Sequence, residues 1–465
     1  MVSEPKSSSL TGPHERHPRV GGLIIRGATV VTMNDAFDVI EGDVMIRDGR
    51  IVSVGPAAAV ADLAGGGGRV IEAHGSYLLP GFIQTHVHLC QTLFRGYADD
   101  LALLDWLKTR IWPMEAAHNP RSLAAAAQQA ASELLRSGTT TVLTMETVHD
   151  TDAVFEALEP MGLRAVVGKC MMDSDTAVPA RLLEQTTHSI DEAVAIAKRW
   201  HGRANGRLRA AFAPRFAVSC SRELLEAVAR LAIDHQLVVH THASENRDEV
   251  ALIESRTGRK NIDYLADTGL ATHRLCLAHC VWVDDAEQSL MAEREVKVLH
   301  CPGSNMKLGS GIAPVVEMRK RGISVSLGAD GAACNNHLDM FEEMRLAAVL
   351  QSLRHAPGAL TARDAMTMAT REGARALGLE AEIGSIEPGK RADLIAIDRH
   401  QPNLALGTDP YSTVVYAARG TDVRTVIVDG EVLVDDFRPV SWDPAEIART
   451  ARTEATALAR RANLF

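Results

Sequence analysis

The sequence predicts an α/β protein, a (β/α)₈ TIM barrel with a composite β-sandwich domain formed by the N- and C-terminal segments. From about residue 82 to 380, short apolar runs typical of strands alternate with helical stretches. This alternation is typical of a parallel sheet, and eight such units in roughly 300 residues fit a closed barrel. Strand-like runs separated by turns lie on both sides of this region, at 20–78 and 384–440. We therefore expect the two β ends to pack together beside the barrel.

The expected strands of the two ends are short and carry turn residues between them. Asp48-Gly49-Arg50 separates two apolar runs near the start, and Asp429-Gly430 separates two near the end, which is a strong hairpin signal. The expected strands include 23–25, 29–31, 44–46, 51–54, 392–397, 425–428 and 431–434.

Between the ends, residues 79–383 are expected to form the barrel. Strands are predicted at 140–144, 164–167, 208–212, 237–241, 275–278, 296–300 and 323–327, with helices at 122–136, 222–235, 284–293 and 340–351 among them. Residues 1–19 are polar and lack an apolar core, so we expect a disordered tail rather than a signal peptide. Residues 441–465 are rich in Ala and Arg and are expected to form a C-terminal helix.

The composition excludes several classes of protein. Basic and acidic residues are interspersed, the net charge is -10, and no basic stripe is present, so nucleic-acid binding is not expected. No apolar run approaches the roughly 18 residues of a membrane span. The seven cysteines include no CxxC pair, which argues against a disulfide framework and favours the reducing cytoplasm. We expect a cytoplasmic homo-oligomer that acts on a small molecule.

A pair of histidines follows the first apolar run of the barrel region. His86 and His88 are two residues apart, so in a strand both imidazoles lie on the same side. Catalytic groups of such barrels gather at the carboxyl ends of the strands. On its own this pair is a weak signal, because two surface histidines would look the same.

Other polar residues at strand ends strengthen the signal. His242, His279 and Asp330 each follow an apolar run, where a core residue would normally be aliphatic. Three imidazoles and a carboxylate with room for water suit Zn²⁺, and Fe²⁺ or another divalent ion would also fit. We assign His86, His88, His242 and Asp330 as ligands of one metal per chain. A second metal would need a bridging ligand from a middle strand, and 211–214 offers neither a lysine nor a carboxylate.

The same residues suggest a hydrolase. A divalent metal makes water a nucleophile near neutral pH. Glu245 lies three residues beyond His242 and is the expected proton shuttle, His279 is expected to hold or polarise the attacked group, and Asp330 is expected to take the proton of the water. The PCxxC run of the cytidine-deaminase type and the GxSxG elbow of serine hydrolases are both absent from the sequence.

These residues resemble the amidohydrolase superfamily, and more narrowly its cytosine-deaminase-like branch. The resemblance runs from about residue 20 to 440 and rests on PGFIQTHVH, HTHASE, LAHC, HCPGSNMKLGSGIAPV, LGADGAACNN and GSIEPGKRADLIAID. It implies a (β/α)₈ barrel, a composite β-sandwich and a mononuclear metal site.

Within that branch the chain is most similar to methylthioadenosine/S-adenosylhomocysteine deaminases. The runs TLFRGYADDLALLDWLKTRIWPMEA and GADGAACNNHLDMFEEMRLAAVLQ carry this likeness. It implies that Glu115 binds ribose hydroxyls, that Arg164 lies near the polar end of the substrate, and that Trp106 lies in the substrate pocket. From the residues alone, Glu115 could equally be an exposed helix residue and Arg164 a surface residue.

Two positions depart from that pattern. Gln91 stands where the family often has methionine, and Arg215 stands where it usually has histidine. Both resemble guanine deaminases, in which Gln and Arg hydrogen-bond the purine, although Arg215 could instead pair with a structural acid. The expected function is hydrolytic deamination of 5′-modified adenosines such as 5′-deoxyadenosine, methylthioadenosine or S-adenosylhomocysteine. A guanine or 8-oxoguanine-type deaminase and a triazine chlorohydrolase or aminohydrolase are the alternatives.

Overall fold

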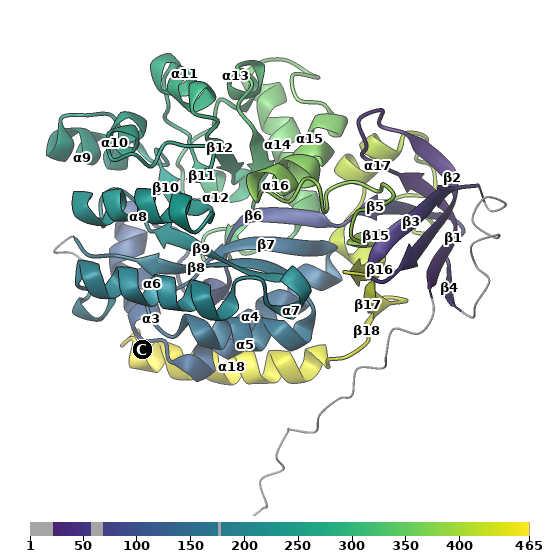
Figure 1. Cartoon of the computed structure of the whole chain (residues 1–465), viewed down its shortest axis with the longest axis horizontal. Helices are drawn as coiled ribbons and strands as arrows, with labels where there is room; N and C mark the ends of the chain where they lie inside the picture. Colours follow the sequence, from purple (N-terminus) through teal and green to yellow (C-terminus); the bar gives the residue numbers. More distant parts are fainter. Residues whose placement is uncertain (1–21, 57–67, 175–177, 465) are drawn as a thin grey trace, which may run out of the picture.

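Two sheets organise the molecule (Figure 1). The computed structural model describes residues 22–56, 68–174 and 178–464, so the tail expected at 1–19 lies outside the described residues. One sheet is parallel and surrounded by helices, and the other joins strands from both ends of the described chain. The α/β class, the barrel and the shared terminal domain predicted from the sequence are confirmed.

The parallel sheet closes into a barrel. Its strands follow one another in sequence order, as expected for consecutive βα units. They are β6 (Phe82–His88), β7 (Thr139–Met145), β8 (Arg164–Met171), β9 (Leu208–Pro214), β10 (Val239–Ala243), β11 (Leu275–His279), β12 (Lys297–His300), β13 (Val325–Leu327) and β14 (Asp330–Gly331).

The last two of these strands form one interrupted segment that completes the ring. β13 pairs with β12, and β14 pairs with β6, where Asp330 lies opposite Val87. Gly328 lies in the interruption, and a Cβ atom there would lie 2.5 Å from the carbonyl oxygen of His86. The absence of a side chain at Gly328 therefore lets the last strand approach the first closely enough to bring Asp330 beside the two histidines.

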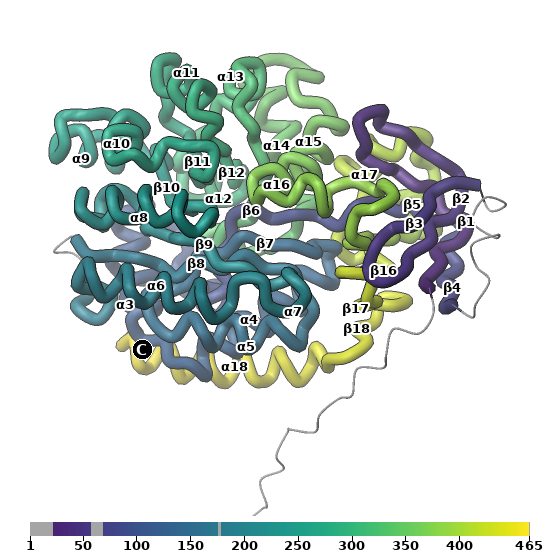
Figure 2. Tube along the Cα trace, in the orientation of Figure 1, coloured from purple at the N-terminus to yellow at the C-terminus, as the bar shows by residue number. Residues whose placement is uncertain are grey.

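Helices surround the barrel and connect its strands (Figure 2). The connecting elements are η1 (Leu89–Phe94), α2 (Leu103–Trp106), η2 (Leu107–Ile111), α3 (Trp112–Ala116), α4 (Pro120–Arg136), α5 (Thr151–Met161), η3 (Ala180–Leu182), α6 (Thr186–Trp200), α7 (Arg203–Gly206), α8 (Arg222–Asp234), α9 (Arg247–Thr257), α10 (Asn261–Asp267), α11 (Asp285–Glu293), α12 (Pro302–Lys307) and α13 (Val315–Lys320). They continue after the last strand with α14 (Met340–Arg354), α15 (Ala362–Ala369), α16 (Arg371–Ala376), α17 (Pro410–Tyr416), η4 (Gly420–Asp422) and α18 (Pro444–Arg461).

The amino-terminal half of the barrel interior is filled. Residues from six of the barrel strands form one buried cluster with residues of α16 and the segment after it: Ile83, Leu143, Val166, Ala211, Cys276, Leu299, Ala374, Ala376, Leu377, Leu379 and Ile383. Gly373 of α16 comes so close to Ile83 that a Cβ atom would lie 2.7 Å away. Because this end is packed, only the carboxyl ends of the strands leave room for a site.

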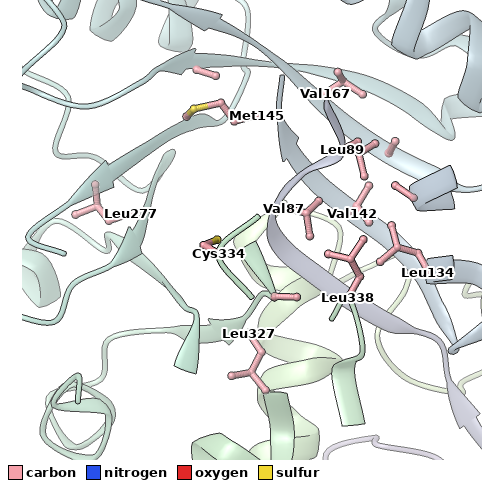
Figure 3. Close-up of a cluster of buried hydrophobic side chains, with 14 of the residues drawn as sticks. Val87, Leu89, Leu134, Val142, Met145, Val167, Leu277, Leu327, Cys334 and Leu338 are labelled. Carbon is pink, nitrogen blue, oxygen red and sulfur yellow. The ribbon is translucent and has the colours of Figure 1, made fainter. Parts of the chain in front are cut away.

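A second, larger apolar layer lies between the strands and the helices. Val87 of β6, Val142 of β7 and Leu134 of α4 belong to it, and all three are fully buried (Figure 3). Successive residues of a strand point to opposite faces, so strands covered on both sides read as nearly continuous apolar runs. This explains why the barrel strands were visible in the sequence.

The second sheet is formed by both ends of the described chain. Its strands are β1 (Leu23–Val31), β2 (Val39–Arg47), β3 (Arg50–Gly55), β4 (Arg69–Glu72), β5 (Ser76–Pro80), β15 (Leu394–Asp398), β16 (Val423–Val428), β17 (Glu431–Asp435) and β18 (Arg438–Pro439). β5 pairs with β15, where Leu394 lies opposite Pro80, which joins the two ends in one hydrogen-bonded sheet around a shared apolar core. The expected boundary between residues 78 and 79 falls inside β5, and the barrel begins at Phe82.

The last helix, α18, lies along α4 on the outside of the barrel. The indole nitrogen of Trp442 donates to Ser132, and Arg461 donates to the carbonyl of Ala117 at 2.9 Å, just beyond the end of α3. Among the described residues, no helix combines the length and apolar character needed to cross a membrane.

Candidate metal centre and active site

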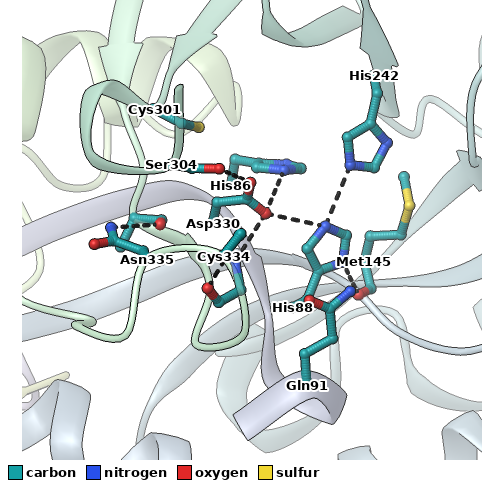
Figure 4. Close-up of polar contacts among 12 residues, drawn as sticks. His86, His88, Gln91, Met145, His242, Cys301, Ser304, Asp330, Cys334 and Asn335 are labelled. Carbon is teal, nitrogen blue, oxygen red and sulfur yellow. Dashed lines mark hydrogen bonds and ion pairs between the residues drawn. The ribbon is translucent and has the colours of Figure 1, made fainter. Parts of the chain in front are cut away.

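The first two candidate ligands lie together at the carboxyl end of β6. His86 and His88 are buried, and their imidazoles point to the same side of the strand, as their spacing predicts (Figure 4). The Nδ1 atom of His88 lies 2.8 Å from the carbonyl oxygen of Met145. A carbonyl accepts only, so Nδ1 carries the proton, and the lone pair of Nε2 faces the interior of the site.

β10 contributes a third imidazole by the same rule. The Nδ1 atom of His242 lies 2.7 Å from the carbonyl oxygen of Arg215, and its Nε2 lies 3.2 Å from Nε2 of His88. His240, two residues earlier, places its Nε2 2.6 Å from Nδ1 of His86. The strand therefore supplies one candidate ligand and one histidine that orients another.

Asp330 joins the imidazoles from the interrupted last strand. Its Oδ1 lies 3.2 Å from Nε2 of His86 and 3.3 Å from Nε2 of His88, and Ser304 donates to its Oδ2 at 2.7 Å. The backbone of Asp330 has a φ of 65°, in the left-handed region that non-glycine residues rarely adopt. Strain of this kind is common at functional sites, where the surrounding structure enforces it.

These atoms are suited to a divalent metal. His86, His88 and Asp330 form one group of converging ligand atoms, and His86, His242 and His279 form a second. Within the described part of the chain, the buried Nε2 of His86 makes no hydrogen bond and only the ion-pair contact with Asp330, and the outer nitrogens of His88 and His242 face carbonyl oxygens. Ligating histidines in metal sites are held by their second nitrogen in this way. The donor set of nitrogen and oxygen atoms fits Zn²⁺ and related ions.

Two further groups face this cluster. His279 ends β11, and its Nε2 lies 3.6 Å from Oε2 of Glu245 and 3.9 Å from Oδ2 of Asp330. Its Nδ1 lies 2.8 Å from Oδ1 of Asn305, and this hydrogen bond fixes the orientation of the imidazole ring. Ser310 donates to Oε1 of Glu245 at 3.2 Å. Glu245 and His279, which were predicted for catalysis together with Asp330, therefore lie at the same end of the barrel as the candidate ligands.

Burial shifts the proton affinities of these groups. Burial raises the pKa of Glu245 to about 7, although the nearby positive charge of His279 acts in the opposite direction. Burial also lowers the pKa of His86 to about 4, which keeps its imidazole neutral and able to bind a metal. A carboxyl group that titrates near neutral pH in a cleft is suited to proton transfer.

A pocket opens over the cluster. It is lined by His88, Gln91, Leu103, Trp106, Leu107, Arg215, Phe216, His242, Glu245, Glu249, His279, Leu308 and Asp330. One wall is apolar and comes mainly from α2 and the π-helical turn η2 that follows it, which places Leu103, Trp106 and Leu107 on the pocket. Apolar walls with a few convergent polar groups are typical of small-molecule sites.

A buried polar chain contributes two residues, Gln91 and Arg215, to the lining of the pocket. Arg215 donates from Nη1 to Oε2 of Glu115 at 2.6 Å, and Gln91 donates from Nε2 to Oε1 of the same carboxylate at 3.0 Å. Glu115 is 2% exposed and Arg215 is 3% exposed, so this is a buried ion pair. The sequence left open whether Arg215 pairs with an acid or faces the pocket, and the structure shows that it does both.

Besides Nε2 of His279, two polar atoms of the pocket residues have no hydrogen-bond partner within the described protein. They are Oε1 of Gln91, which can accept a hydrogen bond, and Nε1 of Trp106, which can donate one. Both are buried, and leaving such groups unpaired costs free energy. They are therefore candidates for contacts with a bound molecule.

Arg164 does not lie at this site. It begins β8, at the amino end of the barrel, and its guanidinium binds Asp393 through two hydrogen bonds of 2.6 and 2.9 Å. Asp393 directly precedes β15, so the pair joins the barrel to the terminal domain. The expectation that Arg164 lies near the polar end of a substrate is wrong, because catalytic groups of such barrels lie at the opposite ends of the strands.

Several residues of the site were not assigned from the sequence. Ser304, Asn305 and Ser310 belong to the run HCPGSNMKLGSG, which carried the resemblance but suggested no individual roles. Their hydroxyl and amide groups act on Asp330, His279 and Glu245 respectively. The run Asn246-Arg247-Asp248-Glu249 has the spacing of a capping box, with Asn246 as the N-cap and Glu249 at position N3. That spacing predicts the start of a helix and does not reveal that Glu249 lines the pocket.

Comparison with known proteins defines the family. The family model described as "Amidohydrolase family" matches residues 77–433, from β5 to β17. The chain belongs to the amidohydrolase family. The matched range includes all the candidate metal ligands together with Glu245 and His279, so the whole cluster lies within the amidohydrolase part of the chain.

Individual relatives of this amidohydrolase are similar over nearly the whole chain. The 5′-deoxyadenosine deaminase of Methanothermobacter thermautotrophicus is 42% identical over 89% of this chain and 93% of its own length. The 5-methylthioadenosine/S-adenosylhomocysteine deaminase of Symbiobacterium thermophilum is 40% identical over 94% of this chain and 99% of its own length. A crystal structure of an adenosine deaminase from Xanthomonas campestris with bound zinc is 33% identical, covers 94% of this chain and 98% of that chain, and has a TM-score of 0.88.

Proposed function

We propose that this amidohydrolase is a metal-dependent hydrolytic deaminase of 5′-modified adenosines, the class of 5′-deoxyadenosine, methylthioadenosine and S-adenosylhomocysteine. The observation that carries the proposal is the convergence of His86, His88, His242 and Asp330 beside Glu245 and His279. The adjoining pocket is lined by Gln91 and Arg215, which both donate hydrogen bonds to the buried carboxylate of Glu115. The names of the relatives that are about 40% identical support the same substrate class.

The four candidate ligands would hold one divalent ion, with Zn²⁺ as the first choice. An ion bound there lowers the pKa of water to near neutral pH and so supplies a nucleophile. The zinc bound to the Xanthomonas campestris protein supports this choice. Metal analysis of protein purified without a chelator should give about one divalent ion per chain. His86→Ala and Asp330→Ala should each lose the ion together with activity, and an active, metal-free preparation would rule the site out.

The residues around the ligands would divide the proton transfers. Asp330 accepts the proton of the attacking water, and Ser304 holds the other oxygen of that carboxylate in place. Glu245 protonates the ring nitrogen beside the attacked carbon, and His279 contacts the group under attack. Water would add at the amino-bearing carbon, and Asp330 would pass the proton it accepted to the amino group, so that the C–N bond breaks and ammonia leaves. The remaining hydroxyl proton would return to Glu245, and the ring would keep the oxygen as a carbonyl.

Substrate recognition would use the polar chain of the pocket. Each oxygen of Glu115 accepts one hydrogen bond, from Gln91 or from Arg215, and each can accept another. We propose that Glu115 accepts the two ribose hydroxyls, while Gln91 and Arg215 contact the edge of the base. Trp106 would contribute its unpartnered N–H group and its apolar surface.

One observation favours a second candidate function. The unpartnered Oε1 of Gln91 and the position of Arg215 in the pocket also suit the direct binding of a free purine base. A guanine-type deaminase would use the same metal and the same shuttle, and the ribose-binding role of Glu115 would be lost. The triazine alternative has no such specific support from the pocket.

An assay of product release separates these candidates. Ammonia should be released from 5′-deoxyadenosine, methylthioadenosine and S-adenosylhomocysteine faster than from guanine, and a chlorotriazine should release no chloride. Faster turnover of guanine than of every adenosine tested would replace the proposal with the guanine-type function. Glu245→Gln should keep the metal and lower kcat by at least about 10²-fold, because the amide cannot shuttle a proton. The cytoplasmic location and the homo-oligomeric state stay predictions.

A further inference from the structure

We propose that Glu249 is a positioning residue that fixes the shuttle Glu245 through the backbone amides of the turn at residues 244–246. This inference rests on the proposed function, because it assumes that Glu245 transfers a proton. Glu249 lies in the first turn of α9 and is 1% exposed. None of the proton transfers proposed for Asp330, Glu245 and His279 involves this carboxylate.

The carboxylate of Glu249 accepts four hydrogen bonds. Its Oε1 accepts from the amide of Ser244 at 3.1 Å, and its Oε2 accepts from the amides of Glu245 at 2.8 Å and Asn246 at 3.4 Å. The side chain of Asn261 donates to Oε1 at 2.7 Å from α10. Three successive amides and one side-chain amide therefore converge on a single buried carboxylate.

The turn held by Glu249 has a conformation that needs support. Ser244 has a φ of 55°, which lies in the left-handed region. Its carbonyl accepts hydrogen bonds from the amides of Val281 and Trp282, each at 2.9 Å. These bonds join the turn that carries Glu245 to the turn that follows His279. Glu249 thus acts on the relative placement of the two catalytic side chains.

Glu245 is consequently held at two points. Glu249 binds its backbone amide, and Ser310 donates to Oε1 of its carboxylate. The carbonyl of Ser310 in turn accepts the indole N–H of Trp282 at 2.8 Å. The carboxylate of the shuttle can transfer a proton efficiently only when it stays within hydrogen-bonding distance of the substrate.

The contacts of Glu249 with the amides of residues 244–246, here called the clamp, require a carboxylate and cannot be made by a side-chain amide. Both oxygens of Glu249 accept, so an amide at this position would direct two N–H donors at backbone N–H donors. Burial raises the pKa of Glu249, and its bonds with the three backbone amides oppose that rise. Glu249→Gln therefore disrupts the clamp while changing side-chain volume very little.

The test is a double-mutant cycle between Glu249→Gln and Glu245→Gln, measured on the adenosine that the wild-type protein deaminates best. In the wild-type background, Glu249→Gln should lower kcat at least about 10-fold and change KM less than about 3-fold, with the metal content unchanged. In the Glu245→Gln background, the same change should lower kcat less than about 2-fold, because the shuttle is already lost. Asp248→Asn, an exposed carboxylate on the same helical turn, is the matched control and should leave kcat unchanged.

Asn261→Ala provides a second route to the same result if Glu249→Gln does not fold. This change removes the hydrogen bond from the side chain of Asn261 to Oε1 of Glu249, so the carboxylate should be held less firmly. It should lower kcat by a smaller factor than Glu249→Gln does, again only when Glu245 is present. Equal losses in both backgrounds, or a lower melting temperature with an unchanged kcat of the folded protein, would overturn the positioning role. Failure of the wild-type protein to release ammonia from any purine would instead overturn the proposed function, so the two failures are distinguishable.

Discussion

Two buried arginine–carboxylate pairs lie at opposite ends of neighbouring barrel strands. Arg164 begins β8 and binds Asp393, whereas Arg215 directly follows β9 and binds Glu115. β8 and β9 pair in parallel, and both arginines are almost completely buried. The chemistry of the two pairs is the same, but only the second pair contributes a residue, Arg215, to the lining of the pocket.

The difference shows that the position along a barrel strand, rather than the residue type, separates a pair that joins two domains from a pair that reaches the pocket. Asp393 also accepts a hydrogen bond from the backbone amide of Asp429 at 2.7 Å. The contacts of the first pair therefore connect the barrel to the terminal domain. Arg215, in contrast, offers its carbonyl to His242 and its guanidinium to Glu115. The second pair therefore links the candidate metal centre to the substrate pocket.

The largest effect is expected from breaking the pair at the amino end. Arg164→Met leaves the carboxylate of Asp393 buried without its counter-ion and should lower the free energy of unfolding by about 3–5 kcal/mol. Urea denaturation followed by circular dichroism measures this change. The matched control is Arg199→Met, which breaks a half-exposed pair with Asp152 and should cost at most about 1 kcal/mol. A loss of kcat in folded Arg164→Met protein without a loss of stability would contradict the structural assignment.

A smaller effect, on catalysis, is expected at the carboxyl end. Glu115→Ala should lower kcat/KM for the nucleoside by about 1–3 kcal/mol, the range for hydrogen-bonding groups left unpaired. It should cost little for a free base, which has no ribose hydroxyls. Steady-state kinetics with both substrates measures the difference. If guanine is the better substrate and Glu115→Ala is silent, Arg215→Ala should become the damaging change.

Replacing both members of each ion pair by neutral residues should separate the effects on stability from the effects on catalysis. Arg164→Met combined with Asp393→Asn removes both charges, keeps an acceptor for the amide of Asp429, and should recover much of the stability with normal kcat. Arg215→Met combined with Glu115→Gln should also recover stability, but kcat/KM should stay low because the pocket has lost its recognition groups. Recovery of activity in the second double variant would contradict the functional assignment of that pair.

The smallest expected effect is the change of kcat/KM with pH near neutrality, which should come from the carboxyl end of the barrel. Burial raises the pKa of Glu245 to about 7, so its carboxyl group holds a proton below that pH and loses it above. Because Glu245 must donate this proton to the ring, kcat/KM should fall as pH rises through about 7, approaching tenfold per unit. A pH–rate profile measures the limb, and Glu245→Gln should remove it. A limb that persists in this variant would assign the titration to another group.

The sequence predicted which side chains of the candidate metal centre meet, because period-two spacing and apolar runs fix their positions. His86, His88, His242 and Asp330 needed only these rules and the convergence of parallel strands. The predicted strand at 164–167 already placed Arg164 at the start of a strand, and the expectation of a substrate contact came from the family motif alone. Glu249 acts through the backbone amides of a turn, and hydrogen bonds of that kind leave little trace in the residue types.

The interrupted last strand has a consequence for the order of folding. β6 and β14 come from opposite ends of the barrel sequence, and their pairing closes the ring. Loop-closure entropy makes such a distant contact slow to form. His86 and Asp330 meet only when it has formed, so high affinity for a metal ion should arise last during refolding. A coloured divalent ion such as Co²⁺, added during refolding, would therefore report the moment at which the ring closes.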